Sequence, residues 1–118
     1  MRKILKALNE VVGIRGSIVV SHDGMVVASS LGKHLDEDRV AAMASSVVHG
    51  THVSLKRQGL PAFKRLTLAT SQGKMVFTDT GVTYLVAVMD AKIDLGPASL
   101  EVESAARKIR SLGEMKIG

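Results

Sequence analysis

The 118-residue chain contains no cysteine. Disulfide bridges, thiolate metal sites and cysteine nucleophiles are therefore excluded, and a reducing compartment is the simpler expectation. Long apolar runs are missing as well, since the longest, residues 85–89, is far shorter than the ~20 residues that span a bilayer. The N-terminus also lacks the compact apolar block of a signal peptide. We therefore expect a cytoplasmic protein that does not insert into a membrane.

Aromatic residues are scarce: the chain has one tyrosine, two phenylalanines and no tryptophan. Base-stacking platforms need more rings than this, and Phe77 and Tyr84 fall in strand-like runs that favour a place in the core. The chain is basic, with a net charge of +5 and a pI near 9.8. Its sixteen Lys and Arg residues are scattered, however, without a dense cluster. The sequence therefore favours an ordinary basic surface and no nucleic-acid partner.

Hydrophobic spacing and turn residues predict eight elements in the order α-β-β-α-β-β-β-α. Helices are expected at residues 2–12, 35–59 and 97–112, the last ended by Gly113, and strands at 16–21, 25–30, 65–71, 75–78 and 82–89. Asp23 and Gly24 form a strong hairpin signal between the first two strands. Residues 13–16 lead into a strand, not a helix, so we interpret them as a turn that lacks a phosphate-binding helix N-terminus.

Apolar runs without alternation in the first two strands indicate that both faces of the sheet are covered. The sequence thus predicts one α/β (α+β) domain over residues 1–118, a three-layer sandwich with a five-stranded antiparallel sheet and helices on both faces. The expected core side of the first helix is Ile4, Leu5, Leu8, Val11 and Val12. That of the central helix is Val40, Met43, Ala44, Val47, Val48, Thr51 and Leu55. That of the last helix is Leu100, Val102, Ala105, Ala106, Ile109 and Leu112.

The central helix has clear ends. Asp36 is placed to cap its first turn, and Lys56, Arg57 and Gly59 supply a matching stop. Between its charged ends, its outer side carries mostly small and uncharged residues, which is unusual for a face that contacts only water. Ala42, Ser46 and Gly50 form a strip of small residues spaced four apart on this side. A glycine inside a helix costs up to ~1 kcal/mol. Gly50 is either merely tolerated or permits a partner helix to approach, and we favour the second interpretation.

The alternating strand at 65–71 is the best candidate for a half-exposed edge, and an open edge of that length invites pairing with another chain. Together with the outer side of the central helix, it predicts a homodimer. The expected interface residues for the second copy or another protein partner are Arg39, Ala42, Ser45, Ser46, His49, Gly50, Val53, Arg57, Arg65, Thr67, Ala69 and Ser71.

No catalytic constellation emerges from the reactive side chains. His49 and His52 are three apart and could share a metal, but no cysteine or carboxylate lies one turn away, so a partner-facing or solvated pair is favoured. The serines near them lack a nucleophile elbow. The three carboxylates that follow strands or open the last helix serve as turn formers or caps: Asp79, Asp90 and Asp94. We therefore expect no enzyme activity, cofactor or metal.

Three local patterns carry a resemblance: VGIRGS at residues 12–17, Asp23-Gly24 at the hairpin, and VMD at 88–90 followed by DLG at 94–96. In this order the chain resembles the Roadblock / dynein light chain family, specifically its stand-alone prokaryotic members, from about residue 4 to residue 112. The resemblance implies a five-stranded antiparallel sheet between helices. It also implies a homodimer in which the second helices pack together and the third strands pair.

The resemblance further implies a regulatory module without an active site. Prokaryotic members act on Ras-like small GTPases, as in the gliding-motility polarity switch, and eukaryotic relatives are scaffolds for motor and GTPase complexes. The expected function is thus a non-catalytic homodimeric regulator or scaffold of a Ras-like GTPase, as an activator or adaptor in polarity, motility or signalling. The alternative is a small ligand-sensing module of profilin- or longin-like architecture. That alternative needs a polar-lined cavity beneath the helices, where the sequence offers mostly Val, Leu, Ala and Met.

Overall fold

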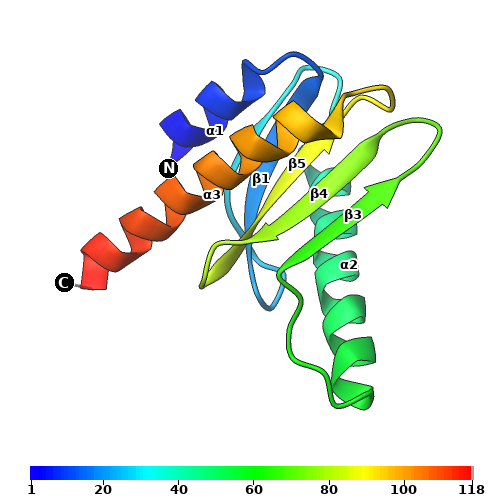
Figure 1. Cartoon of the computed structure of the whole chain (residues 1–118), viewed down its shortest axis with the longest axis vertical. Helices are drawn as coiled ribbons and strands as arrows, with labels where there is room; N and C mark the ends of the chain where they lie inside the picture. Colours follow the sequence, from blue (N-terminus) through cyan, green and yellow to red (C-terminus); the bar gives the residue numbers. More distant parts are fainter. Residues whose placement is uncertain (118) are drawn as a thin grey trace.

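The computed structural model describes residues 1–117, with side chains over residues 1–113. The elements follow the predicted order: α1 (Arg2–Asn9), β1 (Ile14–Ser21), β2 (Val26–Leu31), α2 (Glu37–Arg57), β3 (Arg65–Ala69), β4 (Lys74–Asp79), β5 (Thr83–Met89) and α3 (Leu95–Ile117). The strands form one antiparallel sheet in the order β2-β1-β5-β4-β3. Helices α1 and α3 cover one face and α2 lies on the other (Figure 1). The predicted three-layer α+β sandwich is confirmed.

Each face of the sheet has its own apolar core. On one face Leu5 of α1 and Val102 of α3 pack over Val19 of β1. On the other, Val48 of α2 packs over Ile18 and its neighbours on the central strands. Strand β1 is therefore buried on both sides, which is why its apolar run shows no alternation. Full burial of each such side chain contributes roughly 1.5–3 kcal/mol.

Local chemistry fixes both ends of α2. The Asp36 side chain accepts hydrogen bonds from the backbone N–H groups of Asp38 and Arg39, which satisfies donors that the first turn leaves free. At the other end, Gly59 has φ +72° and its N–H bonds to the Lys56 carbonyl oxygen. This left-handed residue after the last turn is a common helix ending. The predicted limits of the central helix are confirmed.

The first predicted helix is too long, and the turn after it is misplaced. Helix α1 ends at Asn9, and Val12, expected in the core, is 93% exposed. Gly13 has φ +94°, a left-handed conformation that redirects the chain into β1. Ile14 already pairs with Met89 of β5, so residues 14–16 belong to a strand. Pairing with β5 extends β1 further back than propensity alone indicates.

Two expectations about the last helix and the second strand also fail. Helix α3 continues through Gly113 to Ile117, and Leu100 is 71% exposed because it lies off the side that meets the sheet. Val26 and Val27 are exposed because they begin β2, an edge strand of the sheet, and only its later residues, 28–31, are half-buried. Among the residues that the structure describes, no helix has the length and apolar character needed to cross a membrane.

Candidate partner interface

The outer side of α2 carries the predicted strip of small residues, and the chain leaves it open. Ala42, Ser46 and Gly50 are all exposed. A Cβ added at Gly50 would meet no atom within 4 Å, so the chain's own packing does not require glycine there. The strip is therefore a flat surface along which a second helix has room to approach closely.

The other α2 residues of the predicted set divide by exposure. Arg39, His49 and Arg57 are exposed, and Arg39 lies 3.8 Å from the Asp36 carboxylate on its own helix. Val53 and Ser45 are half-buried. Ser45 packs against the hairpin turn so closely that a Cβ on Gly24 would clash with its hydroxyl oxygen. Part of the Ser45 side chain is therefore covered by packing within the chain.

Strand β3 is the second part of this surface. It pairs with β4 on one side and forms the edge of the sheet on the other, as the alternating sequence predicts. Arg65, Thr67 and Ala69 are exposed, and Ser71 is exposed in the turn after the strand. The Arg65 guanidinium forms an ion pair with Glu103 of α3, which places these exposed side chains on the α3 side. The backbone edge itself stays available to another strand.

An apolar groove of about 270 Å³ links α2 with β3 and β4. Its walls include Met43 of α2, Leu68 of β3 and Met75 of β4. Met43 was expected in the core but is 54% exposed. Met43 lines this groove and is not part of the apolar cluster between α2 and the sheet. Hydrophobic periodicity did not predict the exposure of Met43, and these groove residues were missing from the predicted interface.

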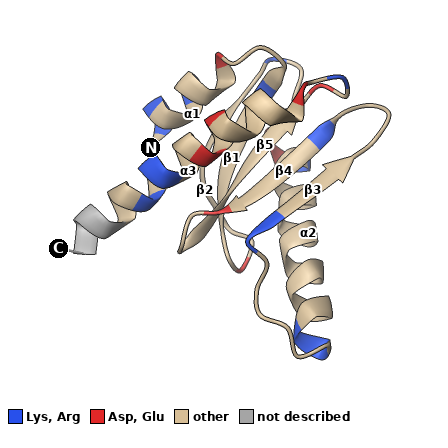
Figure 2. Cartoon of the chain, viewed as in Figure 1, with Lys and Arg blue, Asp and Glu red and all other residues tan. Residues whose placement is uncertain are grey.

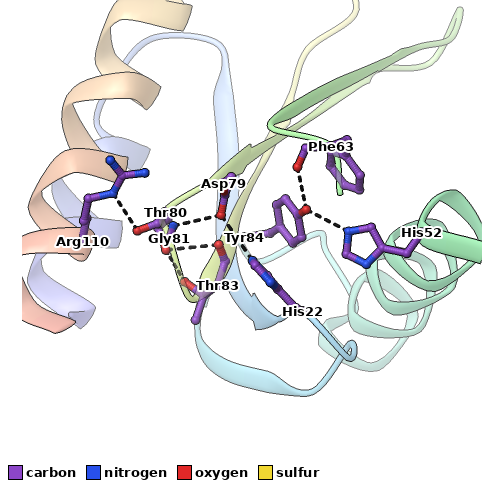
Figure 3. A network of polar contacts seen from close by, with 9 residues as sticks. All are labelled: His22, His52, Phe63, Asp79, Thr80, Gly81, Thr83, Tyr84 and Arg110. Atoms are coloured by element: carbon purple, nitrogen blue, oxygen red, sulfur yellow. Dashed lines mark hydrogen bonds and ion pairs between the residues drawn. The ribbon is translucent and has the colours of Figure 1, made fainter. Parts of the chain in front are cut away.

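A polar cluster beneath α2 holds the helix in place (Figure 3). The Tyr84 hydroxyl donates to the Phe63 carbonyl oxygen at 2.7 Å, so it accepts a hydrogen bond from His52 Nε2 at 2.9 Å. The Phe63 and Tyr84 rings stack with centroids 4.4 Å apart. These contacts join α2, β5 and the link after α2, and so position the strip relative to the sheet.

His22 and Asp79 complete the cluster from the β1–β2 turn and the end of β4. His22 Nε2 lies 3.2 Å from Asp79 Oδ1, and the two rings of His22 and Tyr84 are 4.7 Å apart. Burial, followed by the nearby His22, lowers the pKa of His52. Burial and the Asp79 carboxylate raise the pKa of Tyr84 to about 12. Both changes favour the neutral form of the group.

The cluster also separates the two histidines of α2. His52 points into it, whereas His49 is exposed on the helix, so the possible shared metal pair does not form. Over the residues described, no group of three or more His, Cys, Asp and Glu side chains has a metal-binding arrangement. The grouping of His22, Asp79 and Tyr84 with His52 was not predicted, because the members come from three regions far apart in the sequence.

The chain is similar to several known proteins. The family model of the Roadblock/LC7 domain matches residues 2–90. An uncharacterized protein of Methanocaldococcus jannaschii is 34% identical over 110 residues, which cover 93% of this chain and 96% of that protein. Among solved structures, Myxococcus xanthus MglB has a TM-score of 0.84 at 18% identity, covering 96% of this chain and 86% of that one. A structure described as MglB with tetrameric arrangement has a TM-score of 0.81 at 20% identity, covering 97% and 88%.

At identities this low, the two solved structures establish a shared fold and nothing further. The family match rests on separate grounds, because it extends from α1 through the end of β5, and so includes the whole sheet, α2 and the β3 edge. The chain belongs to the Roadblock/LC7 domain family.

Proposed function

We propose that the protein is a homodimeric regulator or scaffold of a Ras-like small GTPase, without an active site of its own. The observation that carries the proposal is the continuous surface formed by the α2 strip, the apolar groove and the β3 edge. One chain alone leaves all three uncovered. The family resemblance implies dimers built from the same two elements.

The physical case for a second copy comes from what each part of the surface lacks. The edge of β3 has backbone N–H and C=O groups that a second β3 would satisfy, joining the two sheets into one. Met43 and Leu68 expose apolar surface that a second α2 would cover. The small residues at 42, 46 and 50 remove the steric obstacle to that helix contact.

The GTPase part of the proposal rests on family membership together with the neutral middle of α2. Arg39 and Arg57 are exposed near opposite ends of this helix, where they are suited to steer a charged partner. The polar cluster of His52, Tyr84 and Asp79 is engaged in holding α2, not aimed at solvent, which favours a binding role over a catalytic one.

Two measurements test the two halves separately. Sedimentation equilibrium at micromolar concentration is expected to give a dimer, and a monomer would contradict the interface. The immobilised chain is then exposed to lysate of the source organism loaded with GDP or with a non-hydrolysable GTP analogue. A Ras-like GTPase enriched in one nucleotide state is expected. If no such GTPase is captured with either nucleotide, the regulatory role is contradicted. The dimer is tested only by the sedimentation measurement.

A further inference from the structure

A second surface feature lies on the α3 side of the sheet, opposite the core that α2 covers. It is a cleft of about 420 Å³ between the start of β3, the end of β4 and α3. The residues that line it are Lys64, Arg65, Thr78, Asp79, Glu103 and Arg110. Small-molecule sites in proteins have volumes of about 300–1,000 Å³, so the cleft has room for a small metabolite.

The floor of the cleft contains a buried hydroxyl without a partner. Thr78 follows two residues after Val76, which packs in the α1 and α3 core, so its side chain faces the same way. It is only 4% exposed, and its Oγ1 has no hydrogen-bond partner among the side chains and backbone that the structure describes. Buried polar groups are nearly always satisfied, so this hydroxyl calls for a ligand or an ordered water.

Three basic residues line the same cleft as this hydroxyl. Arg65 lies directly opposite Thr78 in the β3–β4 register. Arg110 reaches across from α3, where its Nε donates to the Thr80 carbonyl oxygen at 3.0 Å (Figure 3). This bond fixes the guanidinium at the mouth of the cleft. Lys64 precedes Arg65 and adds a third positive charge, and Figure 2 shows basic segments at the start of β3 and on α3.

The acidic residues of the cleft oppose these charges only in part. The Asp79 carboxylate accepts a hydrogen bond from Gly81 N–H at 2.9 Å and contacts His22, so it is turned toward the cluster beneath α2. Glu103 forms the ion pair with Arg65, but the two side chains are 36% and 44% exposed. A half-exposed pair of this kind contributes little stability, and an incoming anion can displace it at small cost.

We propose that this cleft binds a phosphate group, carried by a small phosphomonoester or present as the free ion. Arg65, Lys64 and Arg110 neutralise its charge, and the Thr78 hydroxyl donates to one of its oxygens. Several cations around one hydrogen-bond donor suit a dianion with three acceptor oxygens better than a carboxylate. Glu103 competes for Arg65 when the site is empty. The inference does not depend on the proposed GTPase partner or on the dimer.

The test is titration calorimetry at constant ionic strength with inorganic phosphate, adenosine monophosphate and acetate. We expect saturable binding of the two phosphates and none of acetate. Thr78→Val, which keeps the side-chain shape, and Arg110→Gln should each weaken binding about tenfold or more. Glu103→Gln should strengthen it several-fold by removing the competitor. Lys108→Gln removes one positive charge on a different side of α3 and should leave the affinity unchanged.

The titrations also distinguish an organic phosphomonoester from the free phosphate ion as the ligand. Adenosine monophosphate that binds at least tenfold more tightly than inorganic phosphate assigns the cleft to an organic phosphomonoester, and equal affinities assign it to the free ion. Binding of acetate as tight as that of phosphate would overturn the proposal. So would equal phosphate affinity in the wild type, Thr78→Val and Arg110→Gln, because binding would then reflect general positive charge. Thermal unfolding of each variant without ligand confirms that it is folded.

Discussion

We expect His52 to make the stability of the fold depend on pH. Its pKa is lowered by burial and by His22 and His49, against an opposing effect of Asp79. The unfolded chain therefore binds this proton more readily than the folded one. The stability that His52 contributes is present above the unfolded-state pKa of about 6.5, and is lost as the pH falls through the folded-state value. We expect urea unfolding to show a smaller loss of stability between pH 8 and pH 5 in His52→Gln than in the wild type.

His49→Gln is the matched control for this experiment, because His49 lies on the same helix but is exposed. Its pH dependence should stay close to that of the wild type, because His49 is the smallest of the contributions that lower the pKa of His52. If His52→Gln and His49→Gln lose stability equally on acidification, the assignment of the effect to the buried cluster is wrong.

Tyr84 tests the same cluster without a change in charge. Its hydroxyl both donates to the Phe63 carbonyl and accepts from His52, in a residue with no exposed surface. Tyr84→Phe keeps the ring stacking and leaves two polar groups unpaired. We expect a loss of about 1–3 kcal/mol in the free energy of unfolding, measured by urea denaturation at pH 8. A loss below about 0.5 kcal/mol would mean that these hydrogen bonds contribute little to the stability of the fold.

Helix α2 is the element on which the proposed dimer depends. Leucine is a better helix former than glycine, and a Cβ added at position 50 would lie in open space. Gly50→Leu is therefore expected to raise the stability of the folded monomer by up to ~1 kcal/mol. It should at the same time weaken the dimer, because the added side chain blocks close helix approach. Thermal unfolding at low concentration and sedimentation measure the two effects separately.

Ser46→Lys provides a second probe of the strip, since it would bury a charge without a partner in the dimer. Ser111→Lys is the matched control, an exposed serine to lysine change on α3. Sedimentation should show dissociation for the first variant and not for the second. If Gly50→Leu and Ser46→Lys both remain dimeric, the dimer interface lies on another surface of the protein.

Patterns within single elements were the most predictable part of this chain. Asp36 and Gly59 mark the ends of α2, and the Asp23-Gly24 turn is correctly placed, because capping and turn geometry depend on a few neighbouring residues. Val12 and Leu100 were wrongly placed in the core for a related reason. Periodicity identifies an apolar side, but it does not say where the helix ends or how far the sheet beneath it extends.

At the scale of the whole molecule, we expect any stimulation of GTP hydrolysis to arise from positioning of the GTPase's own residues. An arginine finger contributes roughly 10³ to 10⁵ in rate and must be held rigidly. The Arg39 side chain is 89% exposed, and Arg57 is exposed at the other end of α2. Arg39→Ala and Arg57→Ala should weaken association while hydrolysis in the saturated complex stays within a few-fold of wild type.

Single-turnover GTP hydrolysis at saturating regulator measures this directly. A thousandfold loss in either variant with binding intact would make the protein a catalytic partner. Ser111→Lys serves here too as a control for a charge change away from α2.

The sequence by itself determined the order of the elements, the three layers and the β3 edge, because hydrophobic period, caps and turns act over a few residues and each could be read locally. Only the tertiary structure decided where α2 sits on the sheet. That placement leaves Met43 exposed in the groove that Leu68 also lines. It likewise decided which distant polar groups meet, bringing His52 to Tyr84 and leaving Thr78 without a partner. These contacts depend on how whole faces pack. Spacing along the sequence does not predict the spatial distance between elements that are far apart in the chain.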